Sequence, residues 1–342
     1  MRAEAQRVGG VADAHPSHKR RAGALRRAGV VVLRWPEASI LLAGALLAAY
    51  FQSTNSAFLS QSNIENLIDY TATTSIIAAG EVMILVCGEL DLSVGMVYAL
   101  SPFIMHFAIA AGLPAGVAVV VALAAAGLVG LANGAVTTIL SVPAFVTTLG
   151  VMFLINGLTL TIPGGFPVEP QAAPVFAAIF GGDAWARLAW SLAIAIALQF
   201  VLKRTRFGLH TIATGGNLLA ASEVGIRVTS IKIRNFVLCS MLGGFAGIID
   251  AFRIGSIDPL AGGAEITFAA IAAAVIGGTL LTGGSGTVIG ALIGALVLGV
   301  LKDSFTLSGV SAYAFDMILG GAILVTMAVN VRLTIWRERG GG

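Results

Sequence analysis

Three acidic residues lie within or directly after an apolar stretch of the chain. Glu81 belongs to the segment 70–86, and Glu89 and Asp91 follow it in the string CGELDLSVG (87–95). An ionised carboxylate is costly inside a membrane, so acids in such a segment usually serve a function or pair with another group. Their types and spacing fit a proton relay, a catalytic pair, an ion site, or polar groups that stabilise a break between helices.

A second candidate for chemistry is the string GGSG (283–286). It fits the G-x-S-G pattern around the nucleophile of rhomboid-type intramembrane proteases, which also needs a histidine on a later helix. All four histidines of this chain precede Ser285, so we interpret the string as a glycine-serine turn between helices. The chain also lacks a phosphate-binding G-x-x-x-x-G-K-[ST] loop and an H-E-x-x-H motif. We therefore predict no catalytic residue, no metal site and no cofactor bound by this chain itself.

The composition is that of a membrane protein with several spans. The 342 residues are 57% hydrophobic and 11% charged, whereas about 25% of the residues of soluble domains are charged. Counting about 20 apolar residues per span, we predict an all-α polytopic membrane protein. Its roughly ten transmembrane helices would lie at 38–54, 70–88, 92–112, 115–140, 143–162, 185–202, 234–252, 264–282, 286–302 and 311–331.

Basic residues gather on one side of these spans. With a cytoplasmic N-terminus and alternating spans, 17 of the 20 lysines and arginines lie in or at the edges of cytoplasmic segments, and only Arg187, Arg253 and Lys302 lie elsewhere. The positive-inside rule thus predicts a multi-pass protein of the bacterial cytoplasmic membrane with both termini inside the cell. Because the basic residues flank helices and form no patch interleaved with aromatic residues, nucleic acid is not an expected partner. The cytoplasmic segments are 1–37, 89–91, 141–142, 203–233, 283–285 and the tail from Arg332.

This topology divides the chain into three parts. Residues 1–37 form a basic cytoplasmic tail that we expect to be poorly ordered, 38–331 a single transmembrane domain, and 332–342 a cytoplasmic tail. The outer loop 163–185 carries four prolines, and we predict a short re-entrant or interfacial helix in it. The inner loop 203–233 is the place where a cytoplasmic partner would have to bind.

The spacing of the acids assigns two of them local roles. Thr74, Glu81 and Gly88 recur every seven residues, so they share one small, polar helix face that should point into the bundle. Asp91 precedes the predicted span 92–112, where its side chain could accept hydrogen bonds from the first free amides, assisted by Ser93. This pattern favours a helix cap at Asp91 and an interior polar group at Glu81.

Small residues mark two helices as tightly packed. Gly286, Gly290 and Gly294 are spaced four residues apart in the predicted ninth helix, and GLVGLANG (127–134) has a similar pattern in the fourth. Such residues let helix backbones approach closely. In a five-plus-five arrangement of inverted repeats, these two helices would correspond with opposite orientation.

At five places in succession the chain resembles the permease subunits of ribose-type sugar ABC importers. The string at 88–95 is similar to the signature G-G-[IV]-D-L-S-V-G of that family, and four further motifs follow in order over roughly residues 60–330. The five strings are GELDLSVG (88–95), VPAFVTTLG (142–150), TRFGLHTIATGGNLLAASEVGI (205–226), AAVIGGTLLTGGSGTVIGALIGALVLGVL (273–301) and GVSAYAFDMILGGAILV (309–325).

The resemblance implies a transport subunit rather than an enzyme. Such a permease pairs with a second copy or a paralogue and receives a monosaccharide, a related polyol or autoinducer-2 from an external sugar-binding protein. Cytoplasmic ATPase subunits bind ATP and Mg. The signature places a translocation path near Glu81, Gly88, Glu89, Asp91, Ser93 and Gly95. The short helix that couples ATP hydrolysis to the membrane helices corresponds to Gly216, Asn217, Ala220, Ala221, Glu223, Gly225 and Ile226.

One departure from the family pattern concerns Glu89. The signature has glycine at this position, and no local structural role explains an acid there. The residue marks either a polyol or other polar substrate, or a heterodimer of two unlike permeases. The rival to the importer hypothesis is a proton-coupled secondary transporter that uses Glu81, Glu89 and Asp91 as a relay.

Overall fold

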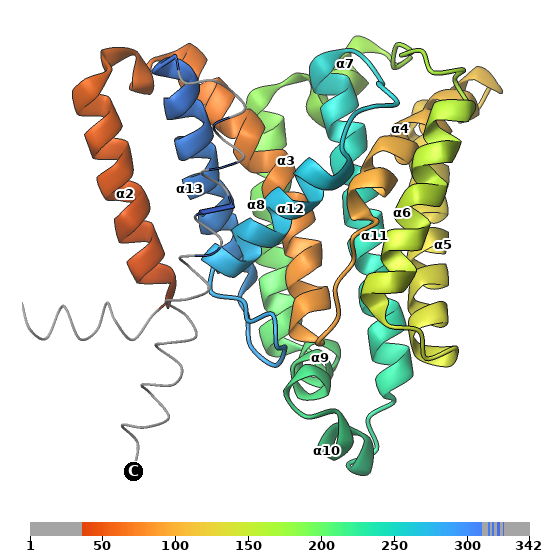
Figure 1. Cartoon of the computed structure of the whole chain (residues 1–342). Coiled ribbons are helices and arrows are strands. Elements are labelled where there is room, and N and C mark those ends of the chain that lie inside the picture. The colour runs from red at the N-terminus through yellow and green to blue at the C-terminus, as the bar shows by residue number, and fades with distance from the viewer. Residues whose placement is uncertain (1–35, 310–313, 315–316, 318–319, 322–323, 325–342) are drawn as a thin grey trace, which may run out of the picture.

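The structure is a computed structural model that describes residues 36–309 and, beyond them, residues 314, 317, 320, 321 and 324. Most of the predicted span 311–331 and nearly all of the two predicted tails lie outside these residues. Within the described part every named element is helical (Figure 1). The helices are α2 (Pro36–Thr54), α3 (Gln61–Val86), α4 (Val94–Ala110), α5 (Ala115–Ile139), α6 (Ala144–Thr161), α7 (Pro174–Ala177), α8 (Ala184–Arg204), α9 (Arg206–Gly216), α10 (Leu218–Glu223), α11 (Val228–Ile254), α12 (Gly263–Ile276) and α13 (Val288–Leu307), with a 3₁₀ turn η1 (Ser56–Leu59) and a π-helical turn η2 (Ala178–Gly182).

The all-helical prediction is confirmed, but the count of ten spans is not. Among the described residues six helices, α3, α5, α6, α8, α11 and α13, are long and apolar enough to cross a membrane. The predicted third and eighth spans correspond to the shorter α4 and α12, which have 17 and 14 residues. The predicted inner loop 203–233 is largely helical, because α9 and α10 occupy most of it.

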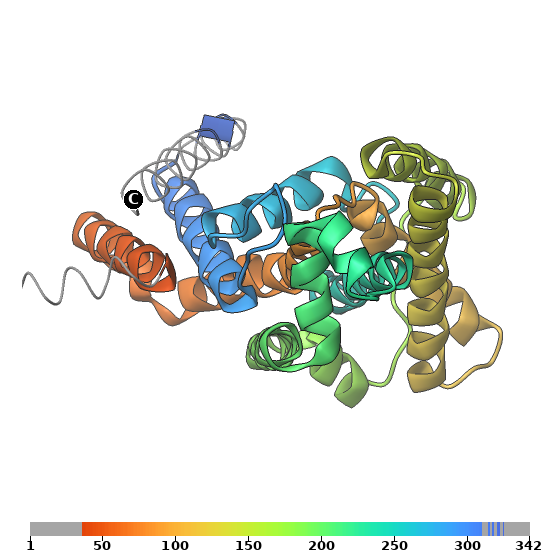
Figure 2. The same cartoon turned by 90° about the horizontal axis from the view of Figure 1, so that it is seen from below.

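The long helices form a bundle in which α3 and α11 are central. From Thr71 to Val86 nearly every residue of α3 is buried, as expected of a helix that is surrounded by protein. Helices α5, α6 and α8 instead expose large apolar side chains, including Leu128, Leu154 and Phe200, which suits contact with lipid. In both views α2 lies at one margin of the bundle, and α5 and α6 lie at the opposite margin (Figures 1 and 2).

We call the end at which α3 begins and α11 ends the upper end, and the end that carries α9 and α10 the lower end (Figure 1). Helix α3 descends to the lower end, and the chain then returns towards the middle, where α4 begins (Figure 1). Residues 89–91 were predicted to lie at the cytoplasmic surface, but Asp91 is 0% exposed. One oxygen of the Asp91 carboxylate accepts hydrogen bonds inside the protein, and the other has no partner among the described residues.

The two short helices meet at their first residues. The Gly95 amide of α4 donates a hydrogen bond to Thr267 Oγ1 of α12 at 3.1 Å. A Cβ atom on Gly95 would lie 2.1 Å from the carbonyl oxygen of Gly263, so only glycine allows this approach. The same kind of contact joins α12 to α13, because a Cβ on Gly294 would lie 2.2 Å from the Ala273 carbonyl oxygen. Gly286 precedes α13, so it lies outside that helix.

Candidate functional site

The break before α4 is held by a buried polar cluster. Asp91 Oδ1 accepts hydrogen bonds from the Ser93 amide at 2.9 Å and from Ser93 Oγ at 2.7 Å. Asn133 of α5 donates to Ser93 Oγ at 2.8 Å. Because α4 begins at Val94, Asp91 stabilises the turn in front of the helix. It does not cap a helix that starts at Leu92, as the sequence suggested.

Glu81 lies at a separate point inside the bundle. Its side chain is 0% exposed, and Cys239 Sγ of α11 lies 3.6 Å from Glu81 Oε1. Among the described residues, the second carboxylate oxygen of Glu81 has no hydrogen-bond partner. Glu81, Glu89 and Asp91 each have different partners and make no hydrogen bond with one another in this part of the chain. This arrangement does not favour the proton-relay hypothesis.

Glu89 forms an ion pair that the sequence analysis missed. Its carboxylate accepts a hydrogen bond from the ammonium group of Lys232, in the second turn of α11. The two side chains are only 14% and 16% exposed. The sequence pattern placed Lys232 only among the basic residues of the predicted cytoplasmic loop 203–233. In the sequence, the signal for such a basic partner was Glu89 itself, an acid at a position where the family signature has glycine.

Glycines join three segments next to this ion pair. The Gly284 amide donates to the Val86 carbonyl oxygen at 2.9 Å, which ties the α12–α13 loop to the end of α3. A Cβ on Gly215 of α9 would lie 1.9 Å from the same oxygen. Gly88 has a φ of 83°, a left-handed conformation that glycine adopts without strain. Ser285 lies in this α12–α13 loop, where its carbonyl oxygen accepts from the Leu280 amide, so the predicted turn is present.

The predicted coupling segment is a short helix at the lower end. Asn217 caps α10 by accepting a hydrogen bond from the Ala220 amide at 3.0 Å, and Gly225 ends the segment with a φ of 85°. Leu219 and Val224 are both 76% exposed. Ala221, one of the predicted coupling residues, is 3% exposed and packs inward. The surface open to a partner is therefore made by the exposed residues Leu218, Leu219, Ala220, Ser222, Glu223 and Val224.

A polar cavity of about 380 Å³ lies in the upper half of the bundle. Helices α3, α4, α11, α12 and α13 all contribute to its wall, so segments far apart in the sequence enclose it. The charged residues on the wall are Asp69, Asp250, Arg253, Glu265 and Lys302. Of the predicted path residues, Glu81 through Gly95, none lines this cavity; only Thr74, which shares the predicted polar face of Glu81, does.

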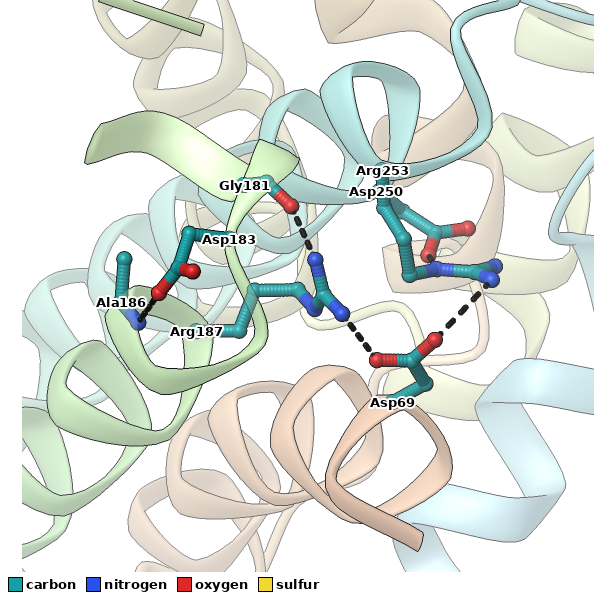
Figure 3. Close-up of polar contacts among 7 residues, drawn as sticks. All are labelled: Asp69, Gly181, Asp183, Ala186, Arg187, Asp250 and Arg253. Carbon is teal, nitrogen blue, oxygen red and sulfur yellow. Dashed lines mark hydrogen bonds and ion pairs between the residues drawn. The ribbon is translucent and has the colours of Figure 1, made fainter. Parts of the chain in front are cut away.

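Ion pairs cross-link the helices on one side of the cavity (Figure 3). Arg187 of α8, with a side chain 5% exposed, pairs with Asp69 of α3 and donates to the Gly181 carbonyl oxygen. Asp69 is also 3.7 Å from Arg253 of α11, which donates in turn to Asp250 at 2.5 Å. Tyr98 of α4 donates its hydroxyl to Asp250 as well. Four helices are thus joined through one charged network.

A separate ion pair lies on another wall of the cavity. The Lys302 ammonium group of α13 is 3.2 Å from Glu265 of α12 and 5.1 Å from the centre of the Tyr70 ring. Arg187, Arg253 and Lys302 are the three basic residues that depart from the positive-inside distribution. Each of them pairs with an acid at the upper end. These exceptions were the signal in the sequence that could have revealed the network.

Comparison with known proteins identifies the family of this fold. A family model described as "Branched-chain amino acid transport system / permease component" matches residues 63–327. The chain belongs to this permease family. Together with the six apolar helices, this membership indicates a multi-pass membrane protein. No solved structure matches the chain.

Several relatives within the permease family are named as sugar importers. The chain is 37% identical over 308 residues to the xylose/arabinose import permease protein of Sulfolobus acidocaldarius, which covers 87% of this chain and 86% of the relative. It is 36% identical over 303 residues to the ribose import permease protein of Escherichia coli K12, with 86% and 93% coverage. The autoinducer 2 import system permease protein of Salmonella typhi is 32% identical over 311 residues, with 89% and 88% coverage. The resemblance to ribose-type permeases is therefore confirmed.

Proposed function

We propose that the chain is the membrane subunit of an ABC importer that carries a monosaccharide or a related polyol. The observation that carries this proposal is the match to permease proteins for xylose/arabinose and for ribose over 86% or more of the chain. An external binding protein delivers the sugar, and partner ATPase subunits bind ATP and Mg. The chain itself is not the ATP-hydrolysing subunit.

The ATPase docks on α10. This helix projects at the lower end of the bundle (Figure 1), where Leu219 and Val224, each 76% exposed, offer apolar surface. An exposed apolar patch on a tip of the protein is typical of a protein contact site. In this assignment the lower end is cytoplasmic, in agreement with the positive-inside distribution of the basic residues.

Two copies of the permease, or two paralogues, form the translocation path between them. The proposal includes an arrangement of the helices as two inverted repeats of five. The two short helices α4 and α12 support this arrangement. α4 follows a chain segment that returns from the lower end, whereas α12 follows one that comes from the upper end, where α11 ends (Figure 1). Inverted repeats place such interrupted helices at corresponding positions in the two halves.

The test is ATP-driven uptake by the assembled importer in proteoliposomes. D-xylose and D-ribose should accumulate when ATP is enclosed with the ATPase, and a proton uncoupler should leave this uptake unchanged. Leu219→Asp should abolish uptake while membrane insertion stays normal, because a charge would enter an apolar protein contact. The matched control is Leu140→Asp, since Leu140 is 67% exposed at the other lower-end turn, between α5 and α6. Uptake that survives Leu219→Asp would contradict docking on α10.

A further inference from the structure

A basic pocket of about 310 Å³ lies at the lower end of the bundle. Residues from the first two turns of α9 and of α11 line it, together with Gly225 and Ile226 of the connection after α10. None of the described residues on its wall is acidic. The side chains on the wall that can donate a hydrogen bond are those of Arg206, His210, Arg227, Ser230 and Arg234.

The three arginines of this pocket are not neutralised within the described part of the chain. Ion pairs there involve Arg187, Arg253 and two lysines, but no arginine of the pocket. The side chains of Arg206, Arg227 and Arg234 make no hydrogen bond to a described residue either, and all three residues are exposed. Like charges gathered around one space repel each other. An anion that enters the pocket is therefore attracted by three cations that need not leave another partner.

The pocket lies where the lipid-facing surface of the bundle ends. Helix α8 exposes the apolar Ile196 and Phe200, and its last turn carries the exposed Lys203 and Arg204. Arg206, which lines the pocket, begins α9 directly afterwards. A change from exposed apolar to exposed basic side chains is typical of the cytoplasmic boundary between hydrocarbon and headgroups. The arginines of the pocket are therefore next to the lipid headgroups of that leaflet.

The same position separates the pocket from the proposed ATPase contact. Helix α10 forms the tip of the lower end, below α9, and contributes no residue to the wall of the pocket (Figure 1). The wall also contains the apolar side chains of Phe207, Ile226 and Ile231. A mixture of cations and apolar groups suits a lipid, whose phosphate is joined to acyl chains, better than it suits an acidic protein surface.

We propose that this pocket binds the phosphate group of an anionic membrane lipid through Arg206, Arg227 and Arg234. Guanidinium groups form paired hydrogen bonds with phosphate oxygens, and basic pockets on the cytoplasmic side of membrane helices bind anionic headgroups. Gly225 and Ile226 belong to the predicted coupling segment and line the pocket, so the bound lipid contacts the connection between α10 and α11. The inference goes beyond the proposed function, because this ligand is not the transported substrate.

Native mass spectrometry of the purified full chain in a neutral detergent tests the proposal. Phosphatidylglycerol should bind more tightly than phosphatidylcholine with the same acyl chains, because only the first has a net negative charge. The double variant Arg206→Gln with Arg234→Gln should raise the dissociation constant for phosphatidylglycerol at least about tenfold, since it removes hydrogen bonds to a charged group. Salt of about 0.15 M screens attraction by more distant cations.

The matched control is Arg204→Gln. Arg204 is an exposed arginine of the same end, two residues before Arg206, and it does not line the pocket. This variant should bind phosphatidylglycerol like the wild type. All three arginines are on the surface, so none of these substitutions removes a buried contact of the bundle.

Four results would overturn the lipid site. Equal binding of the two lipids, or equal affinity of the wild type and the double variant for phosphatidylglycerol, would each do so. Displacement of the lipid by an equal concentration of inorganic phosphate would make the pocket a site for free anions. A double variant that keeps the lipid but no longer binds the ATPase subunit would assign the arginines to the ATPase contact. The binding assay needs no transport, so an importer that accumulates D-xylose without binding this lipid would leave the proposed function standing.

Discussion

The upper and lower ends of the bundle are stabilised by different kinds of contact. At the upper end, charged side chains from α3, α8, α11, α12 and α13 span the spaces between helices, and those from all of these helices except α8 line a cavity. At the lower end, backbone atoms of three segments touch directly, and Gly215 and Gly284 leave no room between them. Side-chain ion pairs can exchange partners when a ligand or water enters. Backbone contacts cannot, so a displacement of α9 moves α3 and the α12–α13 loop as well.

The largest effect is expected from the most buried ion pair of the upper end. Arg187→Met should lower the free energy of unfolding by about 3 kcal/mol, because Asp69, whose side chain is 21% exposed, then keeps only the more distant Arg253 as its partner. Thermal unfolding in detergent, followed by the loss of monodisperse protein, measures the change. The double variant Arg187→Met with Asp69→Leu should recover part of the loss. A double variant no more stable than the single one would show that the charge balance is not what matters here.

A somewhat smaller loss is expected at the lower end, from one added methyl group. Gly215→Ala would bring a Cβ to 1.9 Å from the Val86 carbonyl oxygen and 2.8 Å from the Gly284 amide. Overpacking of this kind costs about 1–3 kcal/mol, which the same unfolding assay can detect. The neighbouring Gly216→Ala is the control, because its nearest atom would be 3.8 Å away. Equal losses in the two variants would refute the steric explanation.

The smallest effect is expected from the ion pair of the lower end, between Glu89 and Lys232. A double-mutant cycle of Glu89→Gln and Lys232→Met should give a coupling energy of about 1 kcal/mol, since both side chains keep some contact with water. The cycle also tests the two sequence-based hypotheses for Glu89. If the acid only binds Lys232, then Lys232→Met should change uptake as Glu89→Gln does, and the order of preference among sugars should stay the same. An altered preference in Glu89→Gln alone would place this carboxylate in contact with the substrate.

Much of the organisation could be predicted from the sequence because it depends on local patterns. Apolar runs predicted the long helices, and the five ordered motifs predicted the family. The lengths of α4 and α12 could not be obtained in this way. A hydropathy pattern does not distinguish a residue buried by lipid from one buried by protein, and both short helices are apolar. The pattern therefore predicted two full spans where the structure has shorter helices.

The candidate site was harder to predict because its contacts join distant parts of the chain. Asp69 and Arg187 are 118 residues apart, and Glu89 and Lys232 are 143 residues apart. No spacing rule connects such pairs. The sequence did contain one indication of these pairs. Arg187, Arg253 and Lys302 lie outside the predicted cytoplasmic segments, where the positive-inside rule leaves few basic residues. The predicted roles of Glu81 and Asp91 concerned the middle of the bundle, away from the cavity.

The meeting of α4 and α12 has a consequence for the order in which the protein is built. With 17 and 14 residues, these helices are about 26 Å and 21 Å long, shorter than a hydrocarbon core of about 30 Å. α12 is shorter than the shortest transmembrane helices, which have about 17 residues, whereas α4 is at that limit, so α12 depends on neighbouring helices for its place in the bilayer. The Gly95 amide at the start of α4 also obtains its partner, Thr267, only when 172 further residues have left the ribosome. Until then the first half of the chain stays in the membrane without this contact, and the Gly95 amide at the start of α4 lacks its partner.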